Sequence, residues 1–157
     1  MNKLNIKKGF TLVELLVVIS IMGILTVISL SSFTTAQVKA RDAQRKSDLD
    51  QVSKALMLYY SDTGTFPALA SSDLFGQENG LSIGVDPNIV YYMRKTPQDP
   101  KSPTMVYEYK TDGKSFNLFA NLENTKDSQC PQPAPYTVGG VSYCYGVASP
   151  NTTLKSW

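Results

Sequence analysis

Hydrophobic residues form an almost unbroken run in the amino-terminal part of the chain. Residues 10–33 carry a single charge, on Glu14. At about 1.5 Å per residue, a helix made of this stretch is about 36 Å long, which exceeds the roughly 30 Å hydrocarbon core of a bilayer. Residues 10–33 are therefore predicted to form a membrane-spanning helix.

In residues 34–62 the apolar residues recur on one side of a helix only. This pattern predicts an amphipathic second half of the same helix, ending at about Asp62. The charged residues from Lys39 to Asp50 are interpreted as its solvated face. The apolar positions recur at spacings of three, four or seven residues: Val38, Leu49, Val52, Leu56 and either Tyr59 or Tyr60.

Residues 63–157 are predicted to form a globular head. Thr63–Pro67 ends the helix, because glycine supplies a left-handed cap and proline cannot continue a helix. Residues 68–87 mix polar and isolated apolar positions, and are expected to form an irregular connection with one short helix near 71–75.

Alternating segments predict antiparallel hairpins in this head. Residues 105–110 and 115–123 flank the turn sequence Thr111–Lys114, and the second segment places its apolar side chains on one face: Phe116, Leu118, Ala120 and Leu122. A second hairpin is predicted for 136–138 and 141–145, joined by two glycines. The expected fold class is α+β, with a long helix packed on a small antiparallel sheet.

Glu14 is the exception in the apolar run. A carboxylate inside a membrane helix is costly and is expected to face a partner. No Lys or Arg lies within helical reach in the apolar run, so the cation must come from a chain terminus or from another molecule. Cleavage after Gly9 would create an α-amine on Phe10, one helical turn from Glu14.

The composition of the chain argues against several classes of function. The formal charge of +2 includes Lys3, Lys7 and Lys8, and loss of these three leaves 12 basic against 13 acidic residues. Nucleic acid is therefore not an expected partner. The chain has no histidine, which excludes imidazole-based triads and histidine-ligated metals, and it has no Gly-rich phosphate loop. We expect no enzyme activity, no cofactor and no metal.

Residues Lys7–Ile19 resemble the class III leader and helix start of type IV pilins and type II secretion pseudopilins. The resemblance implies a pilin-like fold, leader cleavage between Gly9 and Phe10, N-methylation of Phe10, and pairing of Glu14 with the amine of an adjacent subunit in a homo-oligomeric filament. An ordinary secretory signal peptide and an uncleaved anchor are the alternatives, but neither explains the acid in the apolar run.

The resemblance also implies partners, location and boundaries. The expected partners are the prepilin peptidase/methyltransferase and an inner-membrane assembly platform with its ATPase. The precursor is expected to cross the bacterial cytoplasmic membrane once, with its head outside the cytoplasm, before joining an extracellular pilus or pseudopilus. The expected segments are a leader (1–9), a filament-core helix (10–33), the amphipathic half (34–62) and the head (63–157).

The head resembles major pseudopilins in its Pro97–Pro100 turn followed by Tyr107 and Tyr109. Some such heads bind calcium through loop acids; Asp112, Glu123 and Asp127 are the candidates here, although solvated loop acids are the simpler interpretation. Outside the cytoplasm, Cys130 and Cys144 are expected to form a disulfide. By closing the loop between them, this bond would stabilise the folded head by roughly 3 kcal/mol. Buried free thiols are the alternative.

Three functions fit this family: a structural pilus subunit, a pseudopilin serving type II protein secretion, or a minor pilin that binds a surface or DNA. The third would require exposed aromatic rings, for which seven tyrosines of the head are candidates, although tyrosine in strands usually packs. The candidates are Tyr91, Tyr92, Tyr107, Tyr109, Tyr136, Tyr143 and Tyr145.

Overall fold

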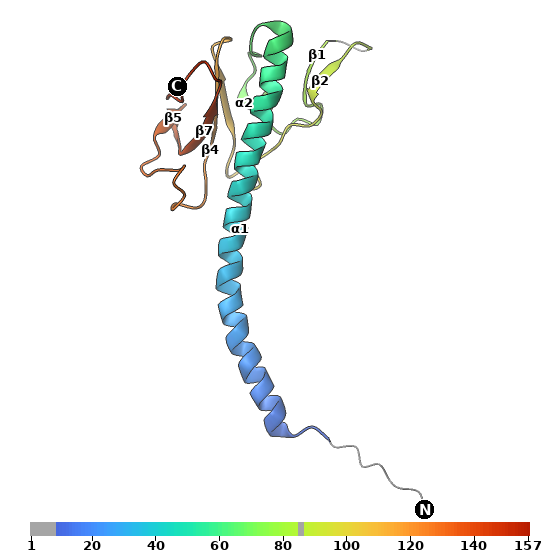
Figure 1. Cartoon of the computed structure of the whole chain (residues 1–157), viewed down its shortest axis with the longest axis vertical. Helices are drawn as coiled ribbons and strands as arrows, with labels where there is room; N and C mark the ends of the chain where they lie inside the picture. Colours follow the sequence, from blue (N-terminus) through green and yellow to red (C-terminus); the bar gives the residue numbers. More distant parts are fainter. Residues whose placement is uncertain (1–8, 85–86) are drawn as a thin grey trace, which may run out of the picture. The chain divides into compact units, whose positions relative to one another are not determined.

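The computed structural model describes residues 9–84 and 87–157, except for the side chains of 28–31. Two compact units are present, residues 1–37 and 38–157, and most of the predicted leader lies outside the described residues. The elements, shown in Figure 1, are α1 (Leu12–Thr63), α2 (Ser71–Leu74), β1 (Leu81–Ile83), β2 (Val90–Met93), β3 (Glu108–Thr111), β4 (Phe116–Ala120), β5 (Tyr136–Val138), β6 (Val141–Tyr143) and β7 (Tyr145–Ala148).

The α+β fold class is confirmed, and so is the end of the long helix. Helix α1 stops at Thr63, and Gly64 follows in the left-handed region with φ of 76°. The Gly64 N–H donates to the carbonyl of Tyr60 at 2.8 Å, which satisfies one of the carbonyls left over at the helix end. Pro67 lies three residues beyond, where a helix could not continue.

The described residues of the head form three small antiparallel sheets. The main sheet has the strand order β3-β4-β7, and β1-β2 and β5-β6 are separate two-stranded ribbons. The predicted hairpin around Thr111–Lys114 is present as β3 and β4, with Thr111 opposite Phe116. The predicted short helix is present as α2. The rest of 68–87 is not wholly irregular, because β1 lies in it, a strand too short to show a clear alternation.

The second hairpin differs from the prediction at its end. Strand β6 stops at Tyr143, and Tyr145 begins β7, which pairs with β4 in the main sheet. Cys144 lies between them, where its N–H donates to Asn121 Oδ1 at 3.1 Å and its sulfur bonds to Cys130. These two attachments hold the chain at the point where it passes from one sheet to the other.

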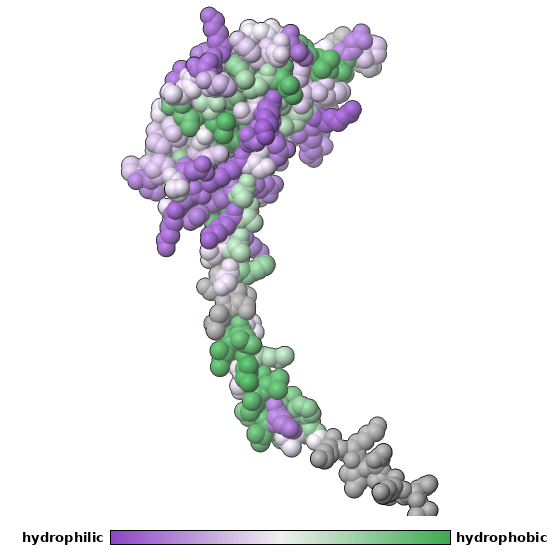
Figure 2. All heavy atoms as spheres, viewed as in Figure 1, coloured by the Kyte–Doolittle hydropathy of each residue, from purple (hydrophilic) through white to green (hydrophobic). Residues whose placement is uncertain are grey.

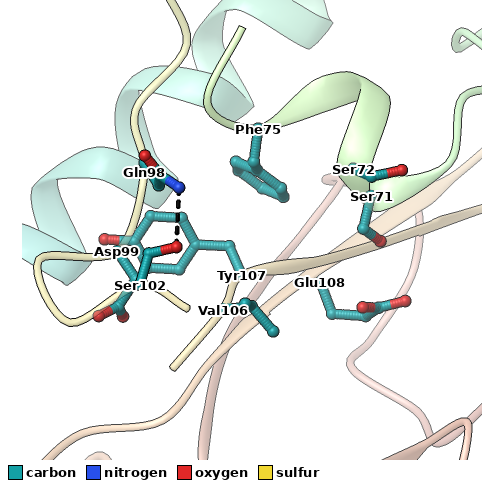
Figure 3. A pocket seen from close by; sticks show the side chains of 9 residues that line it. All are labelled: Ser71, Ser72, Phe75, Gln98, Asp99, Ser102, Val106, Tyr107 and Glu108. Carbon is teal, nitrogen blue, oxygen red and sulfur yellow. Dashed lines mark hydrogen bonds between the residues drawn. The ribbon is translucent and has the colours of Figure 1, made fainter. Parts of the chain in front are cut away.

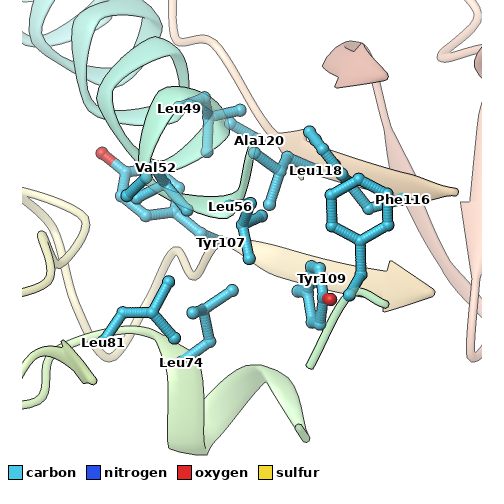
Figure 4. Packing of buried hydrophobic residues seen from close by; sticks show 12 residues of the cluster. Leu49, Val52, Leu56, Leu74, Leu81, Tyr107, Tyr109, Phe116, Leu118 and Ala120 are labelled. Carbon is cyan, nitrogen blue, oxygen red and sulfur yellow. The ribbon is translucent and has the colours of Figure 1, made fainter. Parts of the chain in front are cut away.

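The main core lies between the head portion of α1 and the inner face of the main sheet (Figure 4). Leu49, Val52 and Leu56 of the predicted stripe are buried, and they pack in one cluster with residues of β3, β4 and α2. Each fully buried aliphatic side chain contributes roughly 1.5–3 kcal/mol. Tyr59 and Tyr60 are partly buried against this cluster, and Val38 is partly exposed.

Strand β4 is buried on both faces, so the prediction of one buried face was incomplete. Phe116, Leu118 and Ala120 belong to the main core, whereas Phe119 belongs to a second cluster with Val138 and Tyr143. The β5-β6 ribbon therefore covers the outer face of the strand. Leu122, predicted to share the inner face, packs instead with the two cysteines.

Candidate functional site: the amino-terminal helix and a buried charge network

The start of α1 is closed by reciprocal hydrogen bonds between Thr11 and Glu14. The amide and the hydroxyl of Thr11 each donate to Glu14 Oε2 at 2.8 Å, and the Glu14 amide donates to Thr11 Oγ1 at 3.2 Å. This is a capping box, which satisfies N–H groups that no carbonyl of the helix can reach. The spacing Thr-x-x-Glu is a signal for it that our reading of the sequence overlooked.

The capping box satisfies hydrogen-bonding groups but brings no basic side chain to Glu14. None of the ion pairs within residues 9–84 and 87–157 involves Glu14. The carboxylate is exposed at the first turn of the helix. A charged partner from outside this part of the chain can therefore reach it.

On the face shown in Figure 2, apolar side chains cover most of the helix of the first unit. Every large apolar side chain from Leu12 to Val27 is 42–83% exposed. The hydroxyls of Ser20 and Thr26 donate to carbonyls four residues earlier, at 2.8 and 2.7 Å, so these polar groups are satisfied within the helix. The segment is long and apolar enough to cross a bilayer. Such a surface requires lipid or other apolar helices around it.

The head portion of α1 carries a buried charge network, so the prediction of a solvated face was wrong for Asp42, Arg45 and Asp48, although Lys39 and Asp50 are exposed. Arg45 is fully buried, and Asp42 and Asp48 are nearly so. Arg45 Nε and Nη2 donate to the two carboxylate oxygens of Asp99 at 2.8 and 3.0 Å. Its Nη1 donates to Asp42 at 2.7 Å and to Glu123 at 2.8 Å.

This network joins α1 to the segment that follows β4. Arg41 forms a two-pronged pair with Glu123 at 2.7 Å for both bonds, and Lys101 Nζ lies 2.6 Å from Glu123 Oε2. The carboxylate of Asp42 also accepts the backbone N–H groups of Glu123 and Asn124 at 2.9 and 2.8 Å. The hydrogen bonds from Arg41, together with Lys101 and Arg45, hold the pKa of Glu123 well below its usual range.

Asp48 continues the buried polar strip. It accepts a hydrogen bond of 2.8 Å from the hydroxyl of Tyr107. Burial raises the pKa of the Asp48 carboxyl above its usual value, although the Tyr107 hydrogen bond opposes this change. Burial and the same hydrogen bond raise the pKa of Tyr107. The Tyr107 hydroxyl therefore gives the buried Asp48 carboxylate a hydrogen-bond donor.

Comparison with known proteins supports the reading of the amino-terminal segment. The family model for the prokaryotic N-terminal methylation motif matches residues 4–30. The chain is 33% identical over 104 residues to the type II secretion system core protein G of Klebsiella michiganensis, a match that covers 60% of this chain and 68% of that protein. The chain belongs to the type IV pilin and type II secretion pseudopilin family.

Other relatives come from both branches of this family. The core protein G of Pseudomonas aeruginosa is 27% identical over 122 residues, which are 69% of this chain and 86% of that protein. The type IV major pilin PilA of Myxococcus xanthus is 30% identical over 77 residues, and there the chain spans only 35% of the relative's length. No solved structure gives a significant match.

The pseudopilin resemblance raised Asp112, Glu123 and Asp127 as calcium ligands, and the structure does not bring them together. Asp112 accepts backbone N–H groups within its own turn, and Asp127 pairs with Lys46 at 2.7 Å. Glu123 is not a solvated loop acid, because three basic groups surround it. No group of three or more His, Cys, Asp or Glu suited to a metal occurs in the described part of the chain.

The two cysteines of this family member form a disulfide between Cys130 and Cys144, which packs with Leu122. The bond ties the segment after β4 to the junction of β6 and β7. The same segment carries Glu123 and Asp127, both paired to α1. A covalent bond and ion pairs therefore hold this loop at two ends.

A cavity of about 410 Å³ lies between α2, the 97–102 turn and the start of β3 (Figure 3). Phe75 and Val106 line it, and Gln98 Nε2 donates across one side to Ser102 Oγ at 2.7 Å. Asp99 contributes to the wall, but both of its oxygens are engaged by Arg45. The cavity therefore adjoins the charge network.

The tyrosines proposed as binding rings are mostly packed. Tyr107, Tyr109 and Tyr143 are buried, and Tyr109 donates its hydroxyl to the Pro67 carbonyl at 2.8 Å. Burial raises the pKa of Tyr109 to about 12. Tyr91 is exposed, and the remaining three are partly buried. The head thus lacks, within its described residues, the row of exposed rings that the binding-module hypothesis requires.

Proposed function

We propose that this chain is a filament subunit, made as a membrane-anchored precursor and assembled through its amino-terminal helix. In this proposal the leader is removed after Gly9 and the new amine of Phe10 is methylated. The observation that carries the proposal is the exposed apolar surface of the amino-terminal part of α1, where the large side chains from Leu12 to Val27 are 42–83% exposed. Helices of neighbouring copies would bury this surface in a filament core.

Glu14 would direct assembly in this proposal. Its carboxylate already accepts two hydrogen bonds from Thr11, so a single subunit can keep it in the membrane as part of a stable helix end. The Phe10 amine of a sister subunit would then supply the missing positive charge. In a low-dielectric core an unpaired carboxylate is strongly penalised, so the pairing would also fix the position of each incoming subunit.

Among filament types, the extent of the matches favours a secretion-type pseudopilus. The two core protein G matches cover 60% and 69% of this chain, more than the 49% that the PilA match covers. We propose that the partners are a prepilin peptidase with methyltransferase activity and an inner-membrane assembly platform driven by an ATPase. The head would lie outside the cytoplasm, in agreement with its disulfide.

Processing is tested by the intact mass and amino-terminal sequence of the protein extracted from cell membranes. The expected product begins at Phe10 and carries one added methyl group. A mature chain that still begins at Met1, or one cut near Ala36, would show that the prepilin interpretation is wrong.

Assembly is tested by comparing Glu14→Ala with Glu78→Ala, whose carboxylate lies in an exposed pair with Lys95. We expect Glu14→Ala to retain a folded, disulfide-bonded head and correct processing but to form no filaments, because the sister amine has no counter-charge. Glu78→Ala should assemble normally. Normal filaments from processed Glu14→Ala protein would refute the proposed role.

A further inference from the structure

The buried charge network surrounds one cation with carboxylates from three separate segments. Arg45 is the one fully buried basic residue in the described chain. Asp42 comes from the same helix, Asp99 from the turn before β3, and Glu123 from the segment after β4. All three reach the same guanidinium within 3.0 Å.

Every carboxylate oxygen in this cluster already accepts a hydrogen bond. Arg45 engages both oxygens of Asp99, and the Lys101 amide donates to one of them at 2.7 Å. One oxygen of Asp42 accepts from Arg45 and the other from the Asn124 amide. Both oxygens of Glu123 accept from Arg41, and one of them also accepts from Arg45.

The charges of the cluster also balance. The three carboxylates face three basic groups, those of Arg41, Arg45 and Lys101. Calcium needs six to eight oxygen ligands at about 2.3–2.6 Å, and would have to displace these donors to obtain them. A guanidinium instead offers five N–H donors in a planar fork. Arg45 forms four hydrogen bonds to the three carboxylates of the cluster.

We infer that Arg45 is the structural cation of this head, and that the head folds and persists without any divalent metal. The guanidinium is covalently attached to α1, so neither dilution nor a chelator can remove it. The head's stability should therefore be insensitive to calcium, unlike that of a head whose loops are held by a bound metal. This inference does not depend on the role proposed for Glu14.

The same geometry predicts what happens when the internal cation is lost. In Arg45→Gln, Arg41 and Lys101 would still pair with Glu123, but the cation that Asp42, Asp99 and Glu123 share would be lost, leaving three carboxylates against two basic groups. Convergent carboxylates are the ligands that calcium prefers. The variant should therefore bind calcium, and calcium should restore part of the lost stability. A purely space-filling role for Arg45 would not produce this calcium dependence.

The experiment is thermal unfolding of the full-length chain in detergent, followed by near-ultraviolet circular dichroism, in excess EDTA and in millimolar calcium chloride. The wild-type Tm should be the same in both. Arg45→Gln should melt about 10 °C lower in EDTA, because a buried ion cluster has lost its cation, and should recover part of that difference in calcium. Glu78→Gln, in an exposed pair, should match the wild type in both solutions.

Each outcome bears on the inference. A wild-type Tm that falls in EDTA and recovers in calcium would overturn it, because the head would then need a metal. An Arg45→Gln protein that folds only when calcium is present during refolding would support it. If that variant fails to fold with and without calcium, or melts identically in both, the convergent-carboxylate argument is wrong.

Discussion

Replacing Glu123 with glutamine tests how much the charge network contributes to the head. The substitution keeps the shape of the side chain but removes the negative charge that Arg41, Arg45 and Lys101 share. Arg45 would retain Asp42 and Asp99, whereas Arg41 would lose its two-pronged partner. The variant therefore tests the charge of Glu123 separately from the charges of Asp42 and Asp99.

The size of the effect follows from burial. Removing one partner of a buried pair costs about 3–5 kcal/mol, but exposed pairs contribute only about 0–1 kcal/mol. The Glu123 side chain is 9% exposed, whereas Arg41 and Lys101 are 26% and 45% exposed and would regain water. We therefore expect a loss of about 2–3 kcal/mol at pH 7. At about 2–4 °C per kcal/mol, the Tm should fall by roughly 4–12 °C.

The effect should depend on pH, because its basic partners hold the pKa of Glu123 below the ordinary value of 4.5. A group whose pKa is lower in the folded state stabilises the protein fully above its unfolded pKa, and this stabilisation is lost as pH falls toward the folded pKa. The gap between wild type and Glu123→Gln should thus be constant above about pH 5 and narrow below 4.5.

The measurement is the free energy of urea unfolding of the full-length chain in detergent, from pH 7 to pH 3, for wild type, Glu123→Gln and Glu78→Gln. The last is the matched control, since its carboxylate is 79% exposed beside Lys95. A gap that does not change with pH, or an equal gap for both variants, would refute the electrostatic reasoning.

Two further predictions concern packing and the buried carboxylate. Leu56→Ala should destabilise the head by about 2–5 kcal/mol, because Leu56 is fully buried, whereas Leu58→Ala, at a position 59% exposed on the same helix, should change urea unfolding little. Tyr107→Phe should cost about 1–3 kcal/mol at pH 7 by leaving Asp48 buried without its donor. Since burial already raises the pKa of Asp48, this loss should shrink as pH falls and the carboxyl is protonated, which urea unfolding at pH 7 and pH 4 would reveal.

Local signals in the sequence were enough for much of the fold. The end of α1 depends on Gly64 and Pro67, and the β3–β4 hairpin depends on the turn at Thr111–Lys114, so each is encoded by neighbouring residues. The β1–β2 ribbon and β7 were not predicted correctly. Each is three or four residues long and is defined by a partner strand elsewhere, so periodicity within the strand carries little information.

The charge network could not be identified from charge pattern alone, but its position on the helix was a usable signal. Asp42 and Arg45 extend the stripe of Leu49, Val52 and Leu56 at alternating spacings of three and four residues. They therefore lie on the same face as the core residues. The helical face was thus predictable, whereas the partners Asp99 and Glu123 are more than 50 residues away and depend on the folded head.

Glu14 and Arg45 are both charged residues of α1 at positions where an unpaired charge is costly, Glu14 in the apolar run and Arg45 in the buried stripe. The charge of Arg45 is neutralised within the chain, because folding of the head brings three carboxylates to it. Glu14 receives only hydrogen bonds from Thr11 among the described residues, and these leave its charge in place. A charge neutralised by folding fixes the structure of one subunit, whereas a charge left for a second molecule provides a reason to assemble.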